Sequence, residues 1–412
     1  MIRANRVGLG RALTLALVAA LAAPACRTGA RPDPATATDR DTATDGDLDT
    51  RAAPGKPAPR ATVAAAGPAA GRSPTATRDA IAREIQRWAD LARADTGTDE
   101  ISVEIRQGAL PILDGARAAL AAGRPRLALL RLAFARTDLG AAVYVRERIA
   151  GGQNDAAGFE AEWKRVGGEL GADLGRLDPR ALDGVEPAAL RAVAEAALPH
   201  VRLDYEASLE YGRNTMPIYG LFYLGSARAE RDLVALCRSL SGPATGTAPA
   251  LRGLGAELDA LEVELLAAYR PPASIDRHAE FIAASSAIKE ARELDAAGLR
   301  RGALLRYLQA AVRAARVRPP ATFDRAALAA RLRAHADRLA AAGVDHSVGQ
   351  LFIEVGLDDL DAATADKPPV AAAAIAGDVV TRYLAALGPP PPPAAPRPPP
   401  RVTVTLVRWP FT

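Results

Sequence analysis

The residues that could take part in catalysis form only fragments of known motifs. Ser286 and Lys289 have the Ser-x-x-Lys spacing that places an amine one helical turn from a hydroxyl, but no Lys-Thr-Gly or Lys-Ser-Gly strand accompanies them. Ser226 lies in LGSAR, which is not the Gly-x-Ser-x-Gly nucleophile turn. Gly253 and Gly255 lack the third glycine of a dinucleotide-binding loop. The sequence therefore favours a protein without an enzymatic activity.

Histidines and cysteines are equally sparse. The four histidines are His200, His278, His335 and His346. None of them lies in a His-Glu-x-x-His or similar ligand pattern, so we expect neither a metal site nor a cofactor. Of the two cysteines, Cys237 lies among leucines and is predicted to be a buried thiol.

Aromatic residues gather in one short stretch. Four of the eight Tyr and one of the seven Phe lie between residues 205 and 223. This stretch is either the widest part of the core or a binding groove, in which tyrosines supply apolar area together with a hydroxyl group. In a groove, Arg213 and Asn214 would hold a carboxylate or a peptide backbone. The candidate binding residues are Tyr205, Tyr211, Arg213, Asn214, Tyr219, Phe222 and Tyr223.

The N-terminus has the pattern of an export signal. Residues 1–11 carry three Arg, and residues 12–25 are apolar and uncharged. The segment ends at Cys26 after the small residues Ala23 and Ala25, which resembles a bacterial lipobox, where the Cys is lipidated and becomes N-terminal. We expect a signal peptide over 1–25 and a lipid anchor at Cys26 in the bacterial cell envelope. Ordinary cleavage to a periplasmic or secreted protein, and an uncleaved anchor, are the alternatives.

A polar segment follows the signal. Residues 26–74 contain no aromatic residue, and their only larger aliphatics are Leu48 and Val63. Such a stretch cannot bury enough apolar surface to offset its chain entropy, so we expect a disordered tether. The net charge of +4 comes without any arginine block interleaved with aromatics, and we therefore expect no nucleic-acid partner.

The body of the chain has a helical composition. Ala accounts for about a quarter of the 412 residues, aromatic residues for 4%, and Ala, Leu, Arg and Glu all favour helices. Apolar residues repeat every three or four positions from Ser73 onward, which predicts an α-helical domain over 75–387. After a first helix that begins near Ser73, the predicted helices are 98–109, 111–122, 125–149, 155–170, 186–198, 201–212, 215–240, 249–269, 274–297, 299–317, 323–342, 346–355 and 370–387.

The domain contains an internal repeat. Residues 116–136 and 291–311 are identical at 11 of 21 aligned positions, and a weaker third copy begins at Ala336. Each strong copy predicts a helical hairpin that turns at Gly123 or Gly298, where a left-handed conformation suits only glycine. In the first copy the turn glycine is followed by Ala128, Leu132 and Ala135, and in the second by Ala303, Tyr307 and Ala310.

This order of small, bulky and small residues resembles the tetratricopeptide repeat. The copies do not recur every 34 residues, so the resemblance implies an irregular array of helical hairpins rather than a regular superhelix. We expect an all-α fold in which such an array carries the disordered N-terminal tether and a Pro-rich C-terminal tail.

The last 25 residues differ from the rest. Residues 389–400 hold nine Pro and predict a polyproline II rod of about 37 Å. Residues 401–412 then alternate Val and Leu with Thr, as in a strand. The region 388–412 is therefore expected to be a rod ending in a terminal strand. The function that we expect is a non-enzymatic cell-envelope scaffold that binds an unknown protein or peptide; the alternative is an enzyme or small-molecule receptor with its pocket at 205–223.

Overall fold

The computed structural model describes residues 74–94, 100–174, 182–214, 216–242, 246–318, 322–364 and 366–388. The predicted signal peptide, the tether as far as residue 73, Cys26 and the segment 389–412 lie outside these residues. Within them the chain forms helices and turns, with one isolated β-bridge between Leu251 and Leu387 and no strand. The all-α prediction is confirmed.

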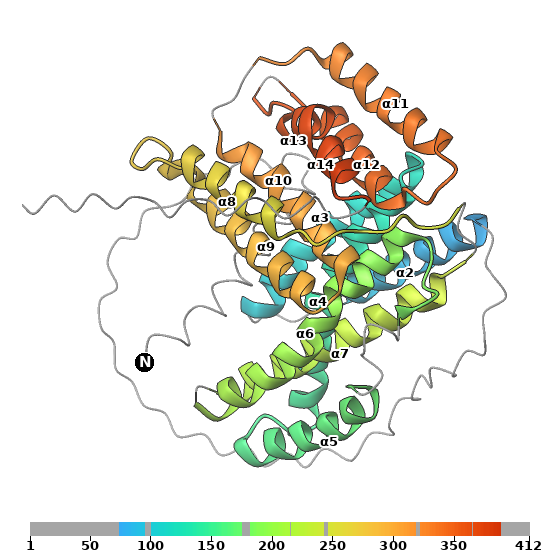
Figure 1. Cartoon of the computed structure of the whole chain (residues 1–412). Helices are drawn as coiled ribbons and strands as arrows, with labels where there is room; N and C mark the ends of the chain where they lie inside the picture. Colours follow the sequence, from blue (N-terminus) through green and yellow to red (C-terminus); the bar gives the residue numbers. More distant parts are fainter. Residues whose placement is uncertain are drawn as a thin grey trace, which may run out of the picture.

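The helices follow the predicted order closely (Figure 1). They are α2 (Pro74–Ala94), α3 (Glu100–Ala121), α4 (Pro125–Ala150), α5 (Ala156–Leu174), α6 (Ala188–Asn214), α7 (Pro217–Leu240), α8 (Gly255–Ala268), η2 (Ile275–Arg277), α9 (His278–Ala296), α10 (Arg300–Val317), α11 (Arg325–Ala341), α12 (Ser347–Asp361), α13 (Val370–Ala374), η3 (Ile375–Val379) and α14 (Val380–Ala385).

Consecutive helices pack as hairpins, namely α3–α4, α6–α7, α9–α10 and α11–α12. The turns of three of them contain a glycine with positive φ: +75° at Gly123, +77° at Gly298 and +69° at Gly343. These are the turn glycines of the two strong repeat copies and of the weak third copy. The repeat-like hairpins are thus present, and the polypeptide turns where the sequence predicts.

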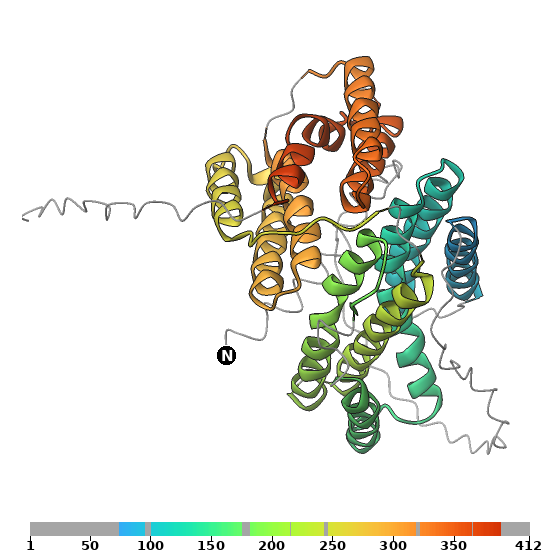
Figure 2. The same ribbon diagram turned by 45° about the vertical axis from the view of Figure 1, so that its right-hand side comes forward.

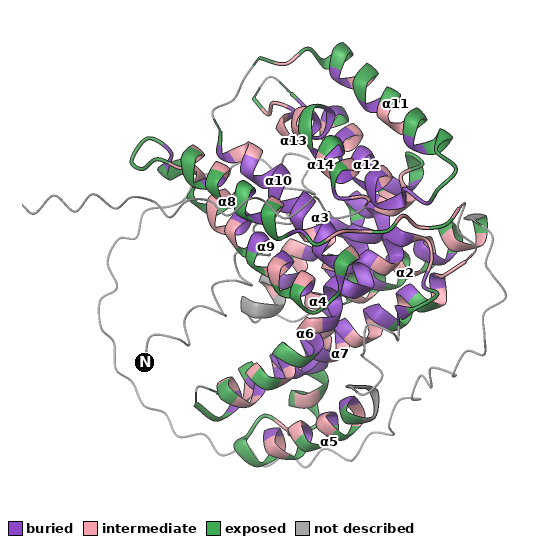
Figure 3. Ribbon diagram, in the orientation of Figure 1, coloured by how far each residue is buried: buried purple, intermediate pink, exposed green. Residues whose placement is uncertain are grey.

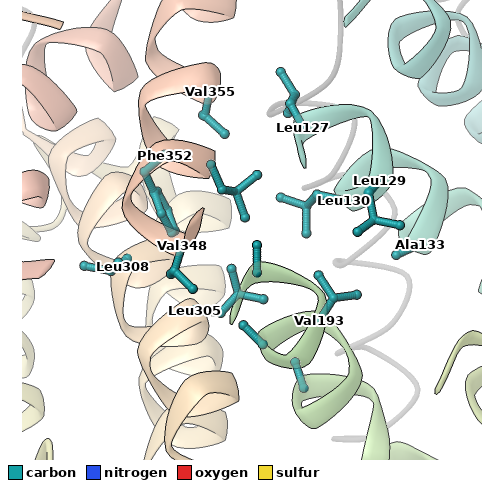
Figure 4. Packing of buried hydrophobic residues seen from close by; sticks show 14 of the residues in the cluster. Leu127, Leu129, Leu130, Ala133, Val193, Leu305, Leu308, Val348, Phe352 and Val355 are labelled. Carbon is teal, nitrogen blue, oxygen red and sulfur yellow. The ribbon is translucent and has the colours of Figure 1, made fainter. Parts of the chain in front are cut away.

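The core lies where four helices from different hairpins meet. Alanine and leucine on α4, α6, α10 and α12 face one another there, and the small alanines allow the helices to approach closely. Figure 4 shows this packing, with side chains labelled at Leu127, Leu129, Leu130, Ala133, Val193, Leu305, Leu308, Val348, Phe352 and Val355.

Buried carboxylates stabilise the N-termini of these helices. The Glu354 carboxylate on α12 accepts a hydrogen bond from the backbone N–H of Leu127 at 2.8 Å, at the start of α4. Glu195 on α6 accepts from Gly302 at 2.9 Å, at the start of α10. Asp345, just before α12, accepts from the first turn of α6 at 2.5 Å. The first N–H groups of a helix have no partner within it, so each carboxylate joins two hairpins.

Two predicted breaks are wrong. Pro111 lies inside α3 and Pro199 inside α6, so each pair of predicted helices is one continuous helix. A proline removes one helical hydrogen bond, but Leu198 and Val201 beside Pro199 are both buried. Burial of such flanking residues outweighs the lost bond. Near the C-terminus the sequence predicts one continuous helix over 370–387, but the π-helical turn η3 divides it into α13 and α14.

Candidate functional site

The α6–α7 hairpin carries all seven candidate binding residues. Pro217 begins α7, a position that suits proline because the first N–H groups of a helix have no helical partner. Gly212 on α6 and Gly220 on α7 lie against each other and against the ring of Phe159 from α5. A Cβ at either glycine would overlap that ring, so the glycines let α5 close on the end of the hairpin. Figure 2 shows α5 lying against this end of the α6–α7 hairpin.

Tyr205 faces α5. Its ring stacks on Trp163, with centroids 5.2 Å apart and planes 9° apart. Its hydroxyl donates a hydrogen bond to the backbone carbonyl of Trp163 at 3.4 Å, and burial raises the pKa of Tyr205 above its ordinary value. Tyr205 therefore helps to hold α5 on the hairpin and is not part of an open surface.

Arg213 also turns toward α5. Its guanidinium pairs with the Glu160 carboxylate, and this hydrogen bond lowers the pKa of Glu160. Asn214, the last residue of α6, is exposed. The structure therefore does not bring Tyr205 and Arg213 together with the other predicted residues.

The remaining aromatics form a second surface. Tyr211 on α6 stacks on Tyr223 of α7, with centroids 4.7 Å apart, and Phe222 meets Tyr223 edge-on at 6.1 Å. Tyr223 is buried, whereas Tyr219, one turn earlier, is 42% exposed. Leu203 and Ala207 recur at four-residue spacing before Tyr211 and extend the same side of α6. We define the α6–α7 face as Leu203, Ala207, Tyr211, Met216, Tyr219 and Phe222.

This face is apolar and partly open. Leu203 is 49% exposed and Met216 is 51% exposed, so both present aliphatic surface to solvent, and Met216 lies one turn before Tyr219. Tyr211 and Phe222 are half-buried and form its floor. Figure 3 shows exposed and intermediate residues along the part of the α6–α7 hairpin that extends beyond α9. Of the seven predicted residues, Tyr211, Tyr219 and Phe222 belong to this face.

A polar cluster lies on the same side of α6, where α9 and α10 approach. His200, three residues before Leu203, places Nε2 3.9 Å from the Glu290 carboxylate of α9. The guanidinium of Arg306 on α10 pairs with the same carboxylate at 2.9 Å. Beyond Arg306, Arg313 is buried and its guanidinium lies 3.9 Å from Glu280.

Charge pairing sets the protonation of this cluster. Burial by itself disfavours both charged forms, but Arg306 and His200 outweigh it and lower the pKa of Glu290 to about 2. Burial likewise lowers the pKa of His200, but the Glu290 carboxylate outweighs that effect and the pKa is raised. Sequence reasoning missed this cluster because its residues come from three helices and follow no local pattern.

The fragments of catalytic motifs remain separate from one another. Ser286 is exposed, and the Lys289 amine is 78% exposed and pairs with Glu293 at 3.8 Å. Cys237 is buried, as predicted, and burial raises the pKa of its thiol to about 12, so it is not a reactive thiolate. Among the residues that the structure describes, no three His, Cys, Asp or Glu side chains are placed to hold a metal ion.

A buried tyrosine network stabilises the end of α4. The Tyr144 hydroxyl donates to the Glu162 carboxylate of α5, and Arg148 Nε lies 3.2 Å from the same group. Arg148 and Arg228 lie over the Tyr144 ring at 5.0 and 5.1 Å. The Glu162 carboxylate and the Tyr144 ring thus hold both arginines between α4, α5 and α7, and we assign the network to structure rather than to binding.

None of the helices in the described part of the chain is long and apolar enough to cross a lipid bilayer. Comparison of the chain with family models, with curated proteins and with solved structures finds no match in any of the three.

Proposed function

We propose that the protein is a non-enzymatic helical scaffold of the cell envelope and that it binds a protein or peptide partner on the α6–α7 face. The observation that carries the proposal is the exposed apolar surface of Met216 and Tyr219 next to the half-buried Tyr211. The exposed Leu203, two turns before Tyr211, continues this surface along α6. The repeat hairpins α3–α4 and α9–α10, which resemble tetratricopeptide hairpins, support the scaffold interpretation.

Rigidity favours binding at this position. The rings of Tyr211, Phe222 and Tyr223 are fixed by mutual stacking, and Phe159 fixes the hairpin from the other side. A surface that is already ordered loses little entropy when a partner binds, and Tyr supplies apolar area at low entropic cost. A partner with an apolar segment would cover Leu203, Met216 and Tyr219.

The cluster of His200, Glu290 and Arg306 would contact polar groups of the same partner. It lies on the same side of α6 as Leu203, and its side chains are only half-buried. An apolar patch bordered by charged groups is the usual composition of a protein–protein interface.

The location in the envelope rests on the N-terminal sequence. A signal peptide over 1–25 and lipidation of Cys26 would place the helical body beside a membrane, linked by the segment 26–74. Partners would then be other proteins of the cell envelope.

A binding experiment tests the proposal. Full-length protein and a Met216→Ser, Tyr219→Ser double variant are each cross-linked in an envelope extract. We expect the double variant to give about tenfold less cross-linked partner than the wild type. Val344→Ser is the matched control, because Val344 is 36% exposed in the α11–α12 turn. If the double variant captures the same partner as strongly as the control, the α6–α7 face is not the binding surface.

A further inference from the structure

Helix α8 exposes an apolar side that the described chain does not cover. Leu258, Leu261 and Leu265 are buried against α9 and α10, as expected for one face of a surface helix. On the other side Val263 is 67% exposed and Leu266 is 58% exposed. We define the α8 outer face as Ala256, Ala260, Val263, Leu266 and Ala267, all of which are exposed.

This double-sided apolar pattern is unusual for a solvated helix. A helix at the surface of a water-soluble body normally carries polar residues on its outer side, and a helix that is apolar on both sides is normally covered on both. Three acids of α8 lie along the edges of the face, Glu262 on one side and Glu257 and Glu264 on the other, whereas Asp259 lies between Leu266 and Val263. The helix itself contains no basic residue.

The end of the described chain is fixed close to the start of this helix. The backbone N–H of Gly388 donates to the Ala250 carbonyl at 3.3 Å, and the N–H of Arg252 donates to the Ala386 carbonyl at 3.2 Å. The Arg252 guanidinium donates to the Ala385 carbonyl at 2.7 Å. Gly388 has φ +102°, so glycine allows the chain to turn here. The segment 389–412 therefore leaves the body about five residues before α8 begins.

The expected length of residues 389–400 matches the distance from Ala250 to the end of α8. Five extended residues and the 14 residues of α8 span at most about 38 Å. The polyproline II rod that the sequence predicts for 389–400 would span about 37 Å. Such a rod makes no internal hydrogen bonds and packs against apolar and aromatic surfaces. An aromatic stack of Tyr269 and Phe281, with centroids 4.2 Å apart, lies just beyond the end of α8.

The composition of the segment fits the same surface. Residues 389–412 contain three Arg and no acidic residue, and they end with Trp409 and Phe411. Asp259 remains 75% exposed and Glu262 47% exposed even though Arg292 pairs with both. The segment thus combines apolar groups for the outer face with positive charge for Asp259 and Glu262.

We propose that the C-terminal segment 389–412 folds back on the same chain and covers the α8 outer face. A second copy of the protein is a poorer occupant, because one stripe of a 14-residue helix offers a few hundred Å², whereas a stable interface buries about 800 Å² on each partner. A tethered segment binds at an effective concentration in the millimolar range, so a small surface suffices. The free segment would otherwise expose ten residues of high β-propensity.

Hydrogen exchange tests the proposal on the full chain. Peptides from α8 are compared between the full chain and a chain that ends at Gly388, and we expect roughly threefold faster exchange in the shorter chain. In the full chain, the amides of residues 401–409 should be protected, and Val263→Asp with Leu266→Asp should remove that protection. The prolines of 389–400 have no amide and give no signal. Leu203→Asp on the α6–α7 face is the matched control.

Three results would overturn the proposal. Equal α8 exchange in both chain lengths, with residues 401–409 exchanging as a free peptide, would mean that the segment projects into solvent or toward another protein. Release of the segment by Leu203→Asp instead of by the α8 substitutions would place it on the α6–α7 face. Protection that increases with protein concentration would mean that the segment binds a second copy.

Discussion

The turn glycines act through the backbone alone. Gly123 and Gly298 have φ of +75° and +77°, and a Cβ at either position would meet no atom within 4 Å. Any cost of a larger residue there is the strain of the left-handed conformation and not a clash. This is why the sequence could predict both positions: the requirement is local and is visible as a glycine between two helical patterns.

We expect Gly123→Val and Gly298→Val each to lower the free energy of unfolding by at least about 1 kcal/mol, because a β-branched residue fits a positive φ poorly. Urea unfolding followed by circular dichroism measures the change. Gly168→Ala is the control: Gly168 lies inside α5 with open space around it, so alanine there should stabilise by about 0.5–1 kcal/mol. Equal effects at all three positions would contradict the turn assignment.

The pair of His200 and Glu290 makes stability depend on pH. Because the pKa of Glu290 is lowered from 4.5 to about 2, its contribution is present above pH 4.5 and is lost as the pH falls toward 2. The pKa of His200 is raised from 6.5, so its contribution is complete below pH 6.5 and is lost as the pH rises through the raised value. The pair therefore stabilises the fold most between these limits.

Glu290→Gln should consequently be less stable than the wild type at pH 5–6, and the difference should shrink as the pH falls toward 2. Denaturant unfolding of both proteins at pH 6, 4 and 2.5 measures the difference. Glu206→Gln serves as the control, since Glu206 is an exposed residue paired with Arg202 and should show little effect at any pH. A deficit of constant size across this range would show that the charge of Glu290 is not the cause.

Among the elements, hairpins were predictable and their contacts were not. Helix periodicity and turn glycines are local, so the order of helices and the all-α class follow from the sequence. The helix break predicted at Pro199 is wrong, because tertiary burial of the neighbouring residues decides whether a helix continues. The aromatic cluster of 205–223 was visible from composition, but its division into a side that faces α5 and an open side depends on Trp163 and Phe159, which lie over 40 residues away.

The closure of α5 on the α6–α7 hairpin depends on a match between Gly212 and the Phe159 ring. Gly212→Ala should lower the free energy of unfolding by about 1–3 kcal/mol, because the added methyl overlaps a buried ring. Phe159→Leu in the same chain leaves space for that methyl. The double variant should therefore be less destabilised than the sum of the single variants. Thermal unfolding of the four proteins measures this coupling, and strict additivity would mean that the ring and the glycine do not restrict each other.

At the scale of the whole molecule, buried acids join the hairpins into one body. Glu354 and Asp345 from the α12 region bind the starts of α4 and α6, and Glu195 of α6 binds the start of α10. The last described residue is in turn fixed beside the segment that leads into α8. The helical body can thus hold the α6–α7 face and the α8 outer face in a fixed relation to each other.

We propose that the N-terminal segment decides where this body acts. Lipidation at Cys26 would place acyl chains at the start of the segment 26–74, and the hydrophobic effect alone would then retain the protein on a membrane. Cys26→Ser removes the thiol that would be acylated. We therefore expect the variant to move from the membrane pellet to the soluble fraction after cell lysis. Cys237→Ser is the control, because Cys237 is buried between helices and contributes no anchor.

If wild type, Cys26→Ser and Cys237→Ser all stay soluble, ordinary secretion replaces lipid anchoring. If all three stay in the pellet even after a high-salt wash that removes bound partner proteins, the apolar residues 12–25 are retained as an uncleaved anchor.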